Sequence, residues 1–195
     1  MSRRGEAERS TRETRVRAAV DLDGTGQARV DTGMPFFDHL LDAFARHGLL
    51  DLEVAARGDL DVEGHHTAED VGLVLGQALR RALGDRAGIR RFGWACLPMD
   101  ETLVLAALDL SGRPYLAWEV AVPARAFGAF HTELAVEFWR ALVNQAGITL
   151  HVRLLAGGNS HHVLEAVWKA VGRALALAAE RDPRVAGPPS TKGVL

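Results

Sequence analysis

Two copies of one short motif constrain the fold of this chain more than any other sequence feature. The pattern His-His-x-x-Glu occurs at 65–69 and again at 161–165, 96 residues further on. Identical residues continue at the same offset on both sides of the motif: Arg57 with Arg153, Val71 with Val167, Gly76 with Gly172, Ala78 with Ala174 and Leu79 with Leu175. Such self-similarity indicates a duplicated half-domain, so the chain is expected to fold as two copies of one unit.

The residue pattern around each motif predicts the same order of elements in both halves. Alternating apolar and polar residues indicate a strand, followed by a glycine-containing turn and by a helix that opens at the motif. A shorter helix precedes each of these strands, and two more strands flank the turn at 111–114. The predicted strands are 52–57, 148–153, 102–110 and 115–122, and the predicted shorter helices are 37–46 and 132–145.

These elements predict an α+β fold of duplicated half-domains, whose sheets have helices packed on one face. We place the first half-domain at 1–92, the second at 93–187 and a C-terminal tail at 188–195, with the two halves fused into one domain.

The starts of the two motif helices carry the residues that usually stabilise a helix N-terminus. Asn159 and Ser160 are expected to cap the second motif helix. Glu69, Asp70 and Glu165 are expected to place negative charge in the first turns, where the helix dipole favours it.

Composition limits the class of ligand. The 195 residues are 48% apolar and 25% charged, which is ordinary for a globular domain. A net charge of −2 offers no basic surface for nucleic acid, so a small substrate is expected, with any anionic group met by a few cations. The chain has no apolar run long enough for a membrane span, a polar N-terminal segment and a single cysteine, Cys96, which together predict a cytoplasmic protein without disulfides.

Both motifs offer nitrogen and oxygen ligands at the start of a helix. Residues three and four apart are helical neighbours, so each glutamate lies beside both histidines of its motif. The two histidines point about 100° apart, so each is expected to serve a different ion. The pattern predicts paired metal sites with approximate two-fold symmetry, completed from both halves or from neighbouring subunits. The candidate ligands in the motifs are His65, His66, Glu69, His161, His162 and Glu165.

A further ligand is expected from the helix before each motif. His39 is the candidate in the first half, and a hydrogen bond with Asp38 at the helix start is its alternative role. Counting back from the second motif leads to Glu137, with His131 as the alternative. Imidazole and carboxylate without thiolate suit manganese, iron, cobalt or zinc, and manganese is preferred.

Several segments of the chain have a distinctive composition and order: HHTAED, NSHHVLEA, FFDHLL and PSTKGVL, together with 9–14, 22–26, 91–93, 98–101 and 109–114. In these segments and in their order, the chain resembles the imidazoleglycerol-phosphate dehydratase family. The resemblance implies half-domains of the split β-α-β type found in ribosomal proteins, and two Mn²⁺ ions per active site held by His39 and both motifs. It also implies a homo-oligomer of 24 subunits, built from trimers with active sites shared between chains. Many members have histidine where this chain has Glu137, so the chain departs from the family there.

The resemblance also implies a reaction, the removal of water from imidazole glycerol phosphate to give imidazole acetol phosphate in L-histidine biosynthesis. No carbonyl lies next to the abstracted proton, so the imidazole ring must accept the electrons. Two ions on the ring nitrogens would favour an imidazolate and a diazafulvene-like intermediate. Glu13 is the candidate acid/base, and Glu69 and Glu165 are further candidate catalytic carboxylates.

Cations are expected to bind the substrate phosphate, and guanidinium suits bidentate contact. If the tail closes over the phosphate, it is an ordered part of the site and not a frayed end. The position of His47 at a helix end indicates an interaction with the helix dipole. His47 is nevertheless included among the candidate substrate contacts. The candidate substrate-binding residues are Glu13, His39, His47, His65, Glu69, Arg91, Arg113, His161, Lys169, Ser190 and Lys192.

Other functions compete with a dehydratase. Paired metals also suit a dinuclear metallohydrolase that acts on a small phosphate ester and releases inorganic phosphate. A non-catalytic protein could use the metals to clamp an oligomer. An RNA-binding module has only fold analogy in its favour, and the net charge of −2 argues against it.

Overall fold

A computed structural model of the chain describes residues 3–193. The elements of the first half are β1 (Arg4–Ser10), β2 (Thr14–Asp21), β3 (Ala28–Asp31), α1 (Pro35–Gly48), β4 (Asp51–Gly58) and α2 (His65–Leu83). The elements of the second half are β5 (Phe92–Met99), β6 (Thr102–Asp109), β7 (Tyr115–Glu119), β8 (Ala126–Phe127), β9 (Phe130–His131), α3 (Leu134–Ala146), β10 (Thr149–Ala156) and α4 (Ser160–Ala179). The α+β class is confirmed.

The two large sheets have the same topology. Their strand orders are β1-β2-β4-β3 and β5-β6-β10-β7, and both end in a parallel pair joined through a helix, β3-α1-β4 and β7-α3-β10. The other pairs in both sheets are antiparallel. The duplication read from the motifs is therefore a duplication of the whole half-domain, and the small β8-β9 hairpin between β7 and α3 has no counterpart in the first half.

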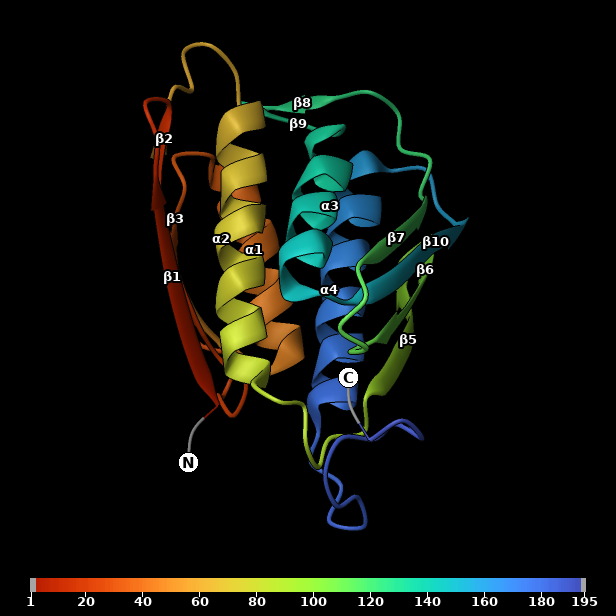
Figure 1. Ribbon diagram of the computed structural model, residues 1–195. Coiled ribbons are helices and arrows are strands. Elements are labelled where there is room, and N and C mark those ends of the chain that lie inside the picture. The colour runs from red at the N-terminus through yellow and green to blue at the C-terminus, as the bar shows by residue number, and fades with distance from the viewer. Residues whose placement is uncertain (1–2, 194–195) are drawn as a thin grey trace.

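Helices fill the space between the two sheets (Figure 1). Helix α2 packs on β1 and β2, and α4 packs on β5 and β6. The remaining helices cross between the halves, because α3 packs on α2 and α1 packs on α4. The largest side chains of the shared core are the fully buried Trp139, Trp168, Phe37, Phe130 and Phe138. Each half thus completes the core of the other.

Repeated glycines allow these layers to approach closely. A Cβ on Gly76 would lie 2.6 Å from the Leu142 carbonyl oxygen in α3, and one on its counterpart Gly172 would lie 2.5 Å from the Phe44 carbonyl oxygen in α1. Any larger side chain at either position would push two helix backbones apart. The glycine pair of the repeat is explained by this helix packing.

The predicted elements are found with small shifts at their ends. Strand β7 ends at Glu119, earlier than expected, because its last paired residue faces Arg153 of β10. The Asn159 side chain accepts hydrogen bonds from the amides of His161 and His162, which confirms the predicted cap.

The expected first-turn charges are wrong. The helices begin at His65 and Ser160, which leaves Glu69, Asp70 and Glu165 beyond the first turn.

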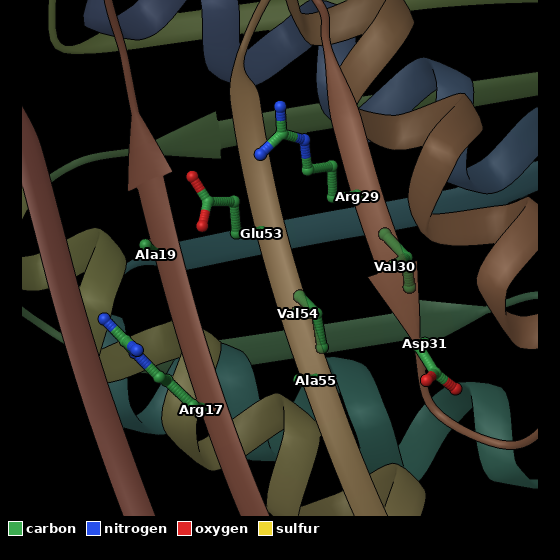
Figure 2. A pocket seen from close by; sticks show the side chains of 8 residues that line it. All are labelled: Arg17, Ala19, Arg29, Val30, Asp31, Glu53, Val54 and Ala55. Carbon is green, nitrogen blue, oxygen red and sulfur yellow. The ribbon is translucent and has the colours of Figure 1, made fainter.

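The outer faces of the two sheets differ in chemistry. On the first sheet, charged side chains surround a hollow of about 410 Å³ floored by Ala19 and Ala55 (Figure 2). On the second sheet, large hydrophobic side chains are exposed, namely Phe92, Trp94, Tyr115 and Leu155. The hollow in Figure 2 contains no predicted site residue, and it lies on the sheet face that points away from the helices.

The described part of the tail is fixed to the body without forming a helix or a strand of a sheet. The amide of Gly88 donates to the Gly187 carbonyl oxygen at 2.9 Å, and Arg91 Nη1 donates to the Pro189 carbonyl oxygen at 2.8 Å. Residues 194–195 of the predicted tail lie outside the described residues. Within 3–193, no helix combines the length and apolar character needed to cross a membrane.

Candidate metal centre and phosphate-binding site

The second motif forms a three-residue donor group with a helix of the first half. The Nε2 atoms of His39 and His161 lie 3.3 Å and 3.0 Å from Oε2 of Glu165. All three ligand atoms lie within 4.8 Å of one another. His39 reaches the second motif because α1 packs on α4, so the group draws on both halves of the chain.

Lys169 holds the glutamate of this group. It lies one turn after Glu165 in α4, and its Nζ is 2.7 Å from Oε1 of the carboxylate. Burial raises the pKa of Glu165, but hydrogen bonds from Lys169 and His39 outweigh this effect and lower the pKa to about 2. The carboxylate is therefore charged, with one oxygen on the lysine and the other facing both histidines.

Aromatic side chains cover one side of the group. Phe36 stacks on Phe127 with ring centroids 4.0 Å apart and meets the His161 ring edge-on at 5.1 Å. Phe127 lies in the β8-β9 hairpin, so the segment that the first half lacks shields the second motif. The His161 side chain is still 42% exposed, so the aromatic rings cover one side of the group and leave the other open.

His162 belongs to a different group. Its Nδ1 is 2.8 Å from Oε2 of Glu101, and its Nε2 is 3.9 Å from Oδ2 of Asp100, both in the turn between β5 and β6. The Glu101 hydrogen bond raises the pKa of His162, and the same bond lowers the pKa of Glu101 to about 2. The rings of His161 and His162 are nearly perpendicular, at 84°. The two histidines therefore face separate groups.

The first motif repeats only part of this arrangement. His66 Nδ1 is 3.0 Å from Oδ2 of Asp59 and 3.9 Å from Oε2 of Glu13. The hydrogen bond to Asp59 raises the pKa of His66. Among residues 3–193, the side chains of His65 and Glu69 make no hydrogen bond or ion pair, and no third ligand joins them. The first motif is open in one chain, whereas the second is assembled.

The candidate ligand on α3 is separated from both donor groups. Glu137 forms an ion pair with Arg140, one turn further along the same helix. The alternative, His131, is an exposed residue of β9. In the described part of the chain, neither belongs to a cluster of three ligand atoms.

Four of the five predicted phosphate contacts line one pocket. Arg91, Arg113, Ser190 and Lys192 surround a space of about 380 Å³ together with Pro189 and Thr191. The fifth, Lys169, does not line this pocket, because its Nζ lies 2.7 Å from Oε1 of Glu165 at the other end of α4.

Asp109 orients the arginines of this pocket. Arg91 donates to its two carboxylate oxygens at 2.7 Å and 3.0 Å, and Arg113 Nη2 lies 3.7 Å from Oδ2. The side chain of Arg113 is 69% exposed. One carboxylate between two guanidinium groups leaves a net positive charge facing the opening.

His47 lies among cations of α4. Burial lowers the pKa of His47, and Lys169 and Arg173 lower it further. A neutral imidazole beside two cations can donate to an anionic group, which is compatible with the predicted substrate contact.

The candidate metal-binding motifs and the arginine pocket lie at opposite ends of helix α4. The motif residues are at the N-terminal end of α4, at the top of Figure 1, whereas the amide of Arg91 donates to the Ala178 carbonyl oxygen at its C-terminal end. The helical rise between His161 and Ala178 is about 25 Å. A small molecule cannot contact both the motif residues and the arginine pocket of the same chain.

The sequence assigned no role to the two carboxylates that hold the second histidine of each motif. Asp59 and Glu101 both accept at Nδ1, which leaves Nε2 as the nitrogen for a metal. Their positions in the sequence were the only signal that could have identified them. Asp59 lies in the loop before the first motif, and Glu101 lies in the hairpin turn that corresponds to the turn of Glu13.

A fused pair of split β-α-β units with histidine and carboxylate donor groups defines a class of duplicated α+β protein suited to metal binding. Within that class, the imidazoleglycerol-phosphate dehydratase family model matches residues 32–175, and the chain belongs to this family.

Relatives cover the whole chain. Imidazoleglycerol-phosphate dehydratase of Moorella thermoacetica is 58% identical over 195 residues, covering 100% of both chains. That of Desulfitobacterium hafniense is 61% identical over 188 residues, or 96% of each. The crystal structure of the Staphylococcus aureus enzyme has a TM-score of 0.82 at 37% identity, covering 92% of this chain and 99% of that one. The Pyrococcus furiosus structure, in complex with (S)-C348, has a TM-score of 0.83 at 37% identity, with 96% and 99% covered.

Proposed function

We propose that this protein removes water from imidazole glycerol phosphate to form imidazole acetol phosphate in L-histidine biosynthesis. The observation that carries the proposal is the donor group of His39, His161 and Glu165, assembled from both halves of a chain in the imidazoleglycerol-phosphate dehydratase family. A hydro-lyase that must activate an imidazole ring needs such nitrogen and oxygen ligands.

The donor set fits manganese, because imidazole and carboxylate are present without thiolate. We propose two Mn²⁺ ions per active site, which would supply Lewis-acid polarisation of the imidazole ring as it passes through imidazolate and diazafulvene forms. The proposed ligands are His39, His65, His66, Glu69, Glu137, His161, His162 and Glu165. Of these, Glu137 would have to leave its ion pair with Arg140.

The chain's own groups would move the proton and hold the phosphate. Glu13 is 59% exposed on its turn and is proposed as the acid/base, assisted by Glu69 and Glu165. The proposed substrate contacts include the pocket of Arg91 and Arg113 with Ser190 and Lys192 of the tail, and the histidines His39, His47, His65 and His161 with Lys169.

Shared active sites follow from the separation of the two ends. Because the arginine pocket and the motif end are about 25 Å apart along α4, one substrate would need the pocket of one chain and the motifs of another. This supports a homo-oligomer, which we propose to be a 24-mer built from trimers. The division into 1–92, 93–187 and 188–195 and the cytoplasmic location remain predictions.

The test is turnover of imidazole glycerol phosphate by chelator-stripped protein before and after manganese is added, followed by product absorbance. Activity that appears only with manganese supports both the reaction and the metal. Release of inorganic phosphate would instead indicate a metallohydrolase. Disassembly on chelation, without substrate binding in the folded and metal-loaded protein, would indicate metals that only clamp an oligomer.

A further inference from the structure

A buried carboxylate next to the first motif binds the β1-β2 hairpin from two sides. Asp70 follows Glu69 on α2 and is 7% exposed. Its Oδ2 accepts a short hydrogen bond from the hydroxyl of Thr14 at the start of β2, and its Oδ1 accepts from Nε of Arg9 in β1 at 3.0 Å. One side chain of the motif helix therefore holds both strands next to the turn that joins them.

The turn between these strands carries Glu13 and is internally rigid. The hydroxyl oxygen of Thr11 accepts from the amides of Glu13 and Thr14 at 3.1 Å and 3.0 Å, and the amide of Thr11 donates to the Thr14 carbonyl oxygen at 2.8 Å. Where Thr14 is fixed, the backbone of Glu13 is fixed as well. The Glu13 carboxylate then lies 3.9 Å from Nδ1 of His66.

The second half fixes its equivalent turn in a different way. Ala166 stands at the position that corresponds to Asp70, so α4 has no carboxylate there. Instead, Glu101 of the turn itself accepts from the Asn159 amide at 3.2 Å and contacts His162 at 2.8 Å. The second turn is therefore anchored by its own carboxylate, Glu101. The first turn is anchored by Asp70 of α2, and the Glu13 carboxylate takes no part in holding it.

We propose that Asp70 is a positioning residue that holds the β1-β2 turn on the first motif so that the Glu13 carboxylate stays free beside His66. The inference rests on the proposed function in one respect, because that function makes Glu13 the acid/base. The anchor itself is a property of the protein without metal or substrate. A displacement of a reacting group by about 1 Å can cost about a hundredfold in rate, so a loosened turn should lower kcat.

The test removes the hydrogen bond and keeps the shape. Thr14→Val is isosteric and cannot donate to Asp70, whereas Thr14→Ser keeps the hydroxyl. We expect Thr14→Val to lower kcat about tenfold or more with KM changed less than about twofold, and Thr14→Ser to restore most of the rate. Asp70→Asn should act in the same direction. Glu6→Gln, which breaks the surface pair with Arg17 on the same hairpin at 3.4 Å, is the matched control.

Two further measurements separate positioning from general destabilisation. In a Glu13→Gln background, Thr14→Val should have no further effect on kcat, because its effect passes through Glu13. In the metal-free and substrate-free protein, amides of residues 11–14 should exchange faster with solvent in Thr14→Val than in Thr14→Ser.

An equal loss of kcat in both backgrounds, or unchanged exchange in the turn, would overturn the proposal. Absence of turnover in the unmodified protein would overturn the proposed function instead, and the exchange measurement would still decide whether Asp70 anchors the turn.

Discussion

The two half-domains have the same fold and the same motif, yet the second motif is assembled within one chain and the first is open. Helix packing explains part of the difference, because α1 brings His39 to the second motif, whereas Glu137 of α3 pairs with Arg140 and belongs to neither donor group of the described residues. The cation beside the glutamate explains the rest. Lys169 follows Glu165 by one turn, and the first half has Leu73 at the corresponding position. Duplication has kept the candidate ligand residues of the motif, and the residues around them have diverged.

The loops that follow the second strand of each sheet, β2-β3 and β6-β7, also differ in the residue that holds them. In the first half, Oδ1 of Asp51 accepts from the amides of Thr25 and Gln27 at 2.8 Å and 3.0 Å, so the β2-β3 loop is closed by an internal anion. The β6-β7 loop meets the neutral Thr149, whose hydroxyl donates to the Arg113 carbonyl oxygen at 3.1 Å. The second loop is therefore free to offer the Arg113 guanidinium to an external anion.

The largest expected effect comes from removing the charge of each motif glutamate. Glu165→Gln and Glu69→Gln should both lower turnover by about a thousandfold, as expected for the loss of a ligand that supplies several kcal/mol. Only Glu165→Gln should also destabilise the fold, by about 1–3 kcal/mol, because it leaves the largely buried Lys169 without its partner. Kinetics and denaturant unfolding of metal-free protein measure the two effects. Equal destabilisation by both variants would contradict the asymmetry between the halves.

Glu13 and Glu101, the carboxylates of the two equivalent hairpin turns, should differ in which step their loss affects. Glu13→Gln is expected to lower kcat about a hundredfold with manganese affinity unchanged, because the side chain is proposed to move a proton. Glu101→Gln should weaken manganese binding about tenfold through His162, with a rate loss that excess manganese restores. Calorimetric titration with manganese and steady-state kinetics distinguish them. A rate loss in Glu101→Gln that manganese does not restore would show that both turns carry reacting groups.

Features set by a local sequence pattern could be predicted from the sequence, whereas contacts between distant segments could not. The repeat predicted the order of strands and helices in each half and the fold class, because a strand period, a helix period and a duplicated motif are all local. The pairing of His39 with Glu165 could not be predicted, because it depends on α1 crossing to α4. The sequence assigned no functional partner role to Asp59, Asp70 or Glu101, since a single carboxylate has no periodic signature. The tail and Arg91 were grouped only through the family's motifs, because the contact between Arg91 and Pro189 spans 98 residues of chain.

Loss of the tail should affect substrate binding more than the chemical step. Removal of residues 188–195 takes Ser190 and Lys192 out of the arginine pocket and frees Arg91 from the Pro189 carbonyl oxygen. We expect KM to rise about tenfold, which corresponds to the loss of about one charge-assisted hydrogen bond, with a smaller change in kcat. Initial rates over a range of substrate concentrations give both constants, and Arg17→Gln on the outer face of the first sheet is a control. Unchanged turnover at low substrate would refute a phosphate contact by the tail.

The smallest expected effect compares the two loop anchors. Hydrogen bonds from the backbone amides of Thr25 and Gln27 lower the pKa of Asp51 below its ordinary value of 3.8. A lowered pKa means that the charged carboxylate stabilises the folded state, so this contribution is complete above pH 3.8 and is lost as the pH falls through the lower folded value. Asp51→Asn should therefore cost about 1 kcal/mol at neutral pH, and the difference from the unmodified protein should shrink in acid.

Thr149→Val in the second half removes one neutral hydrogen bond, and its cost should not change with pH. Unfolding free energies of both variants, measured on metal-free protein from neutral pH to about pH 3, compare the loops directly. If both costs vary alike with pH, Asp51 does not act as an internal anion. If only the Asp51 difference varies, the first loop is closed by charge and the second is held by a neutral contact, which leaves its arginine available for phosphate.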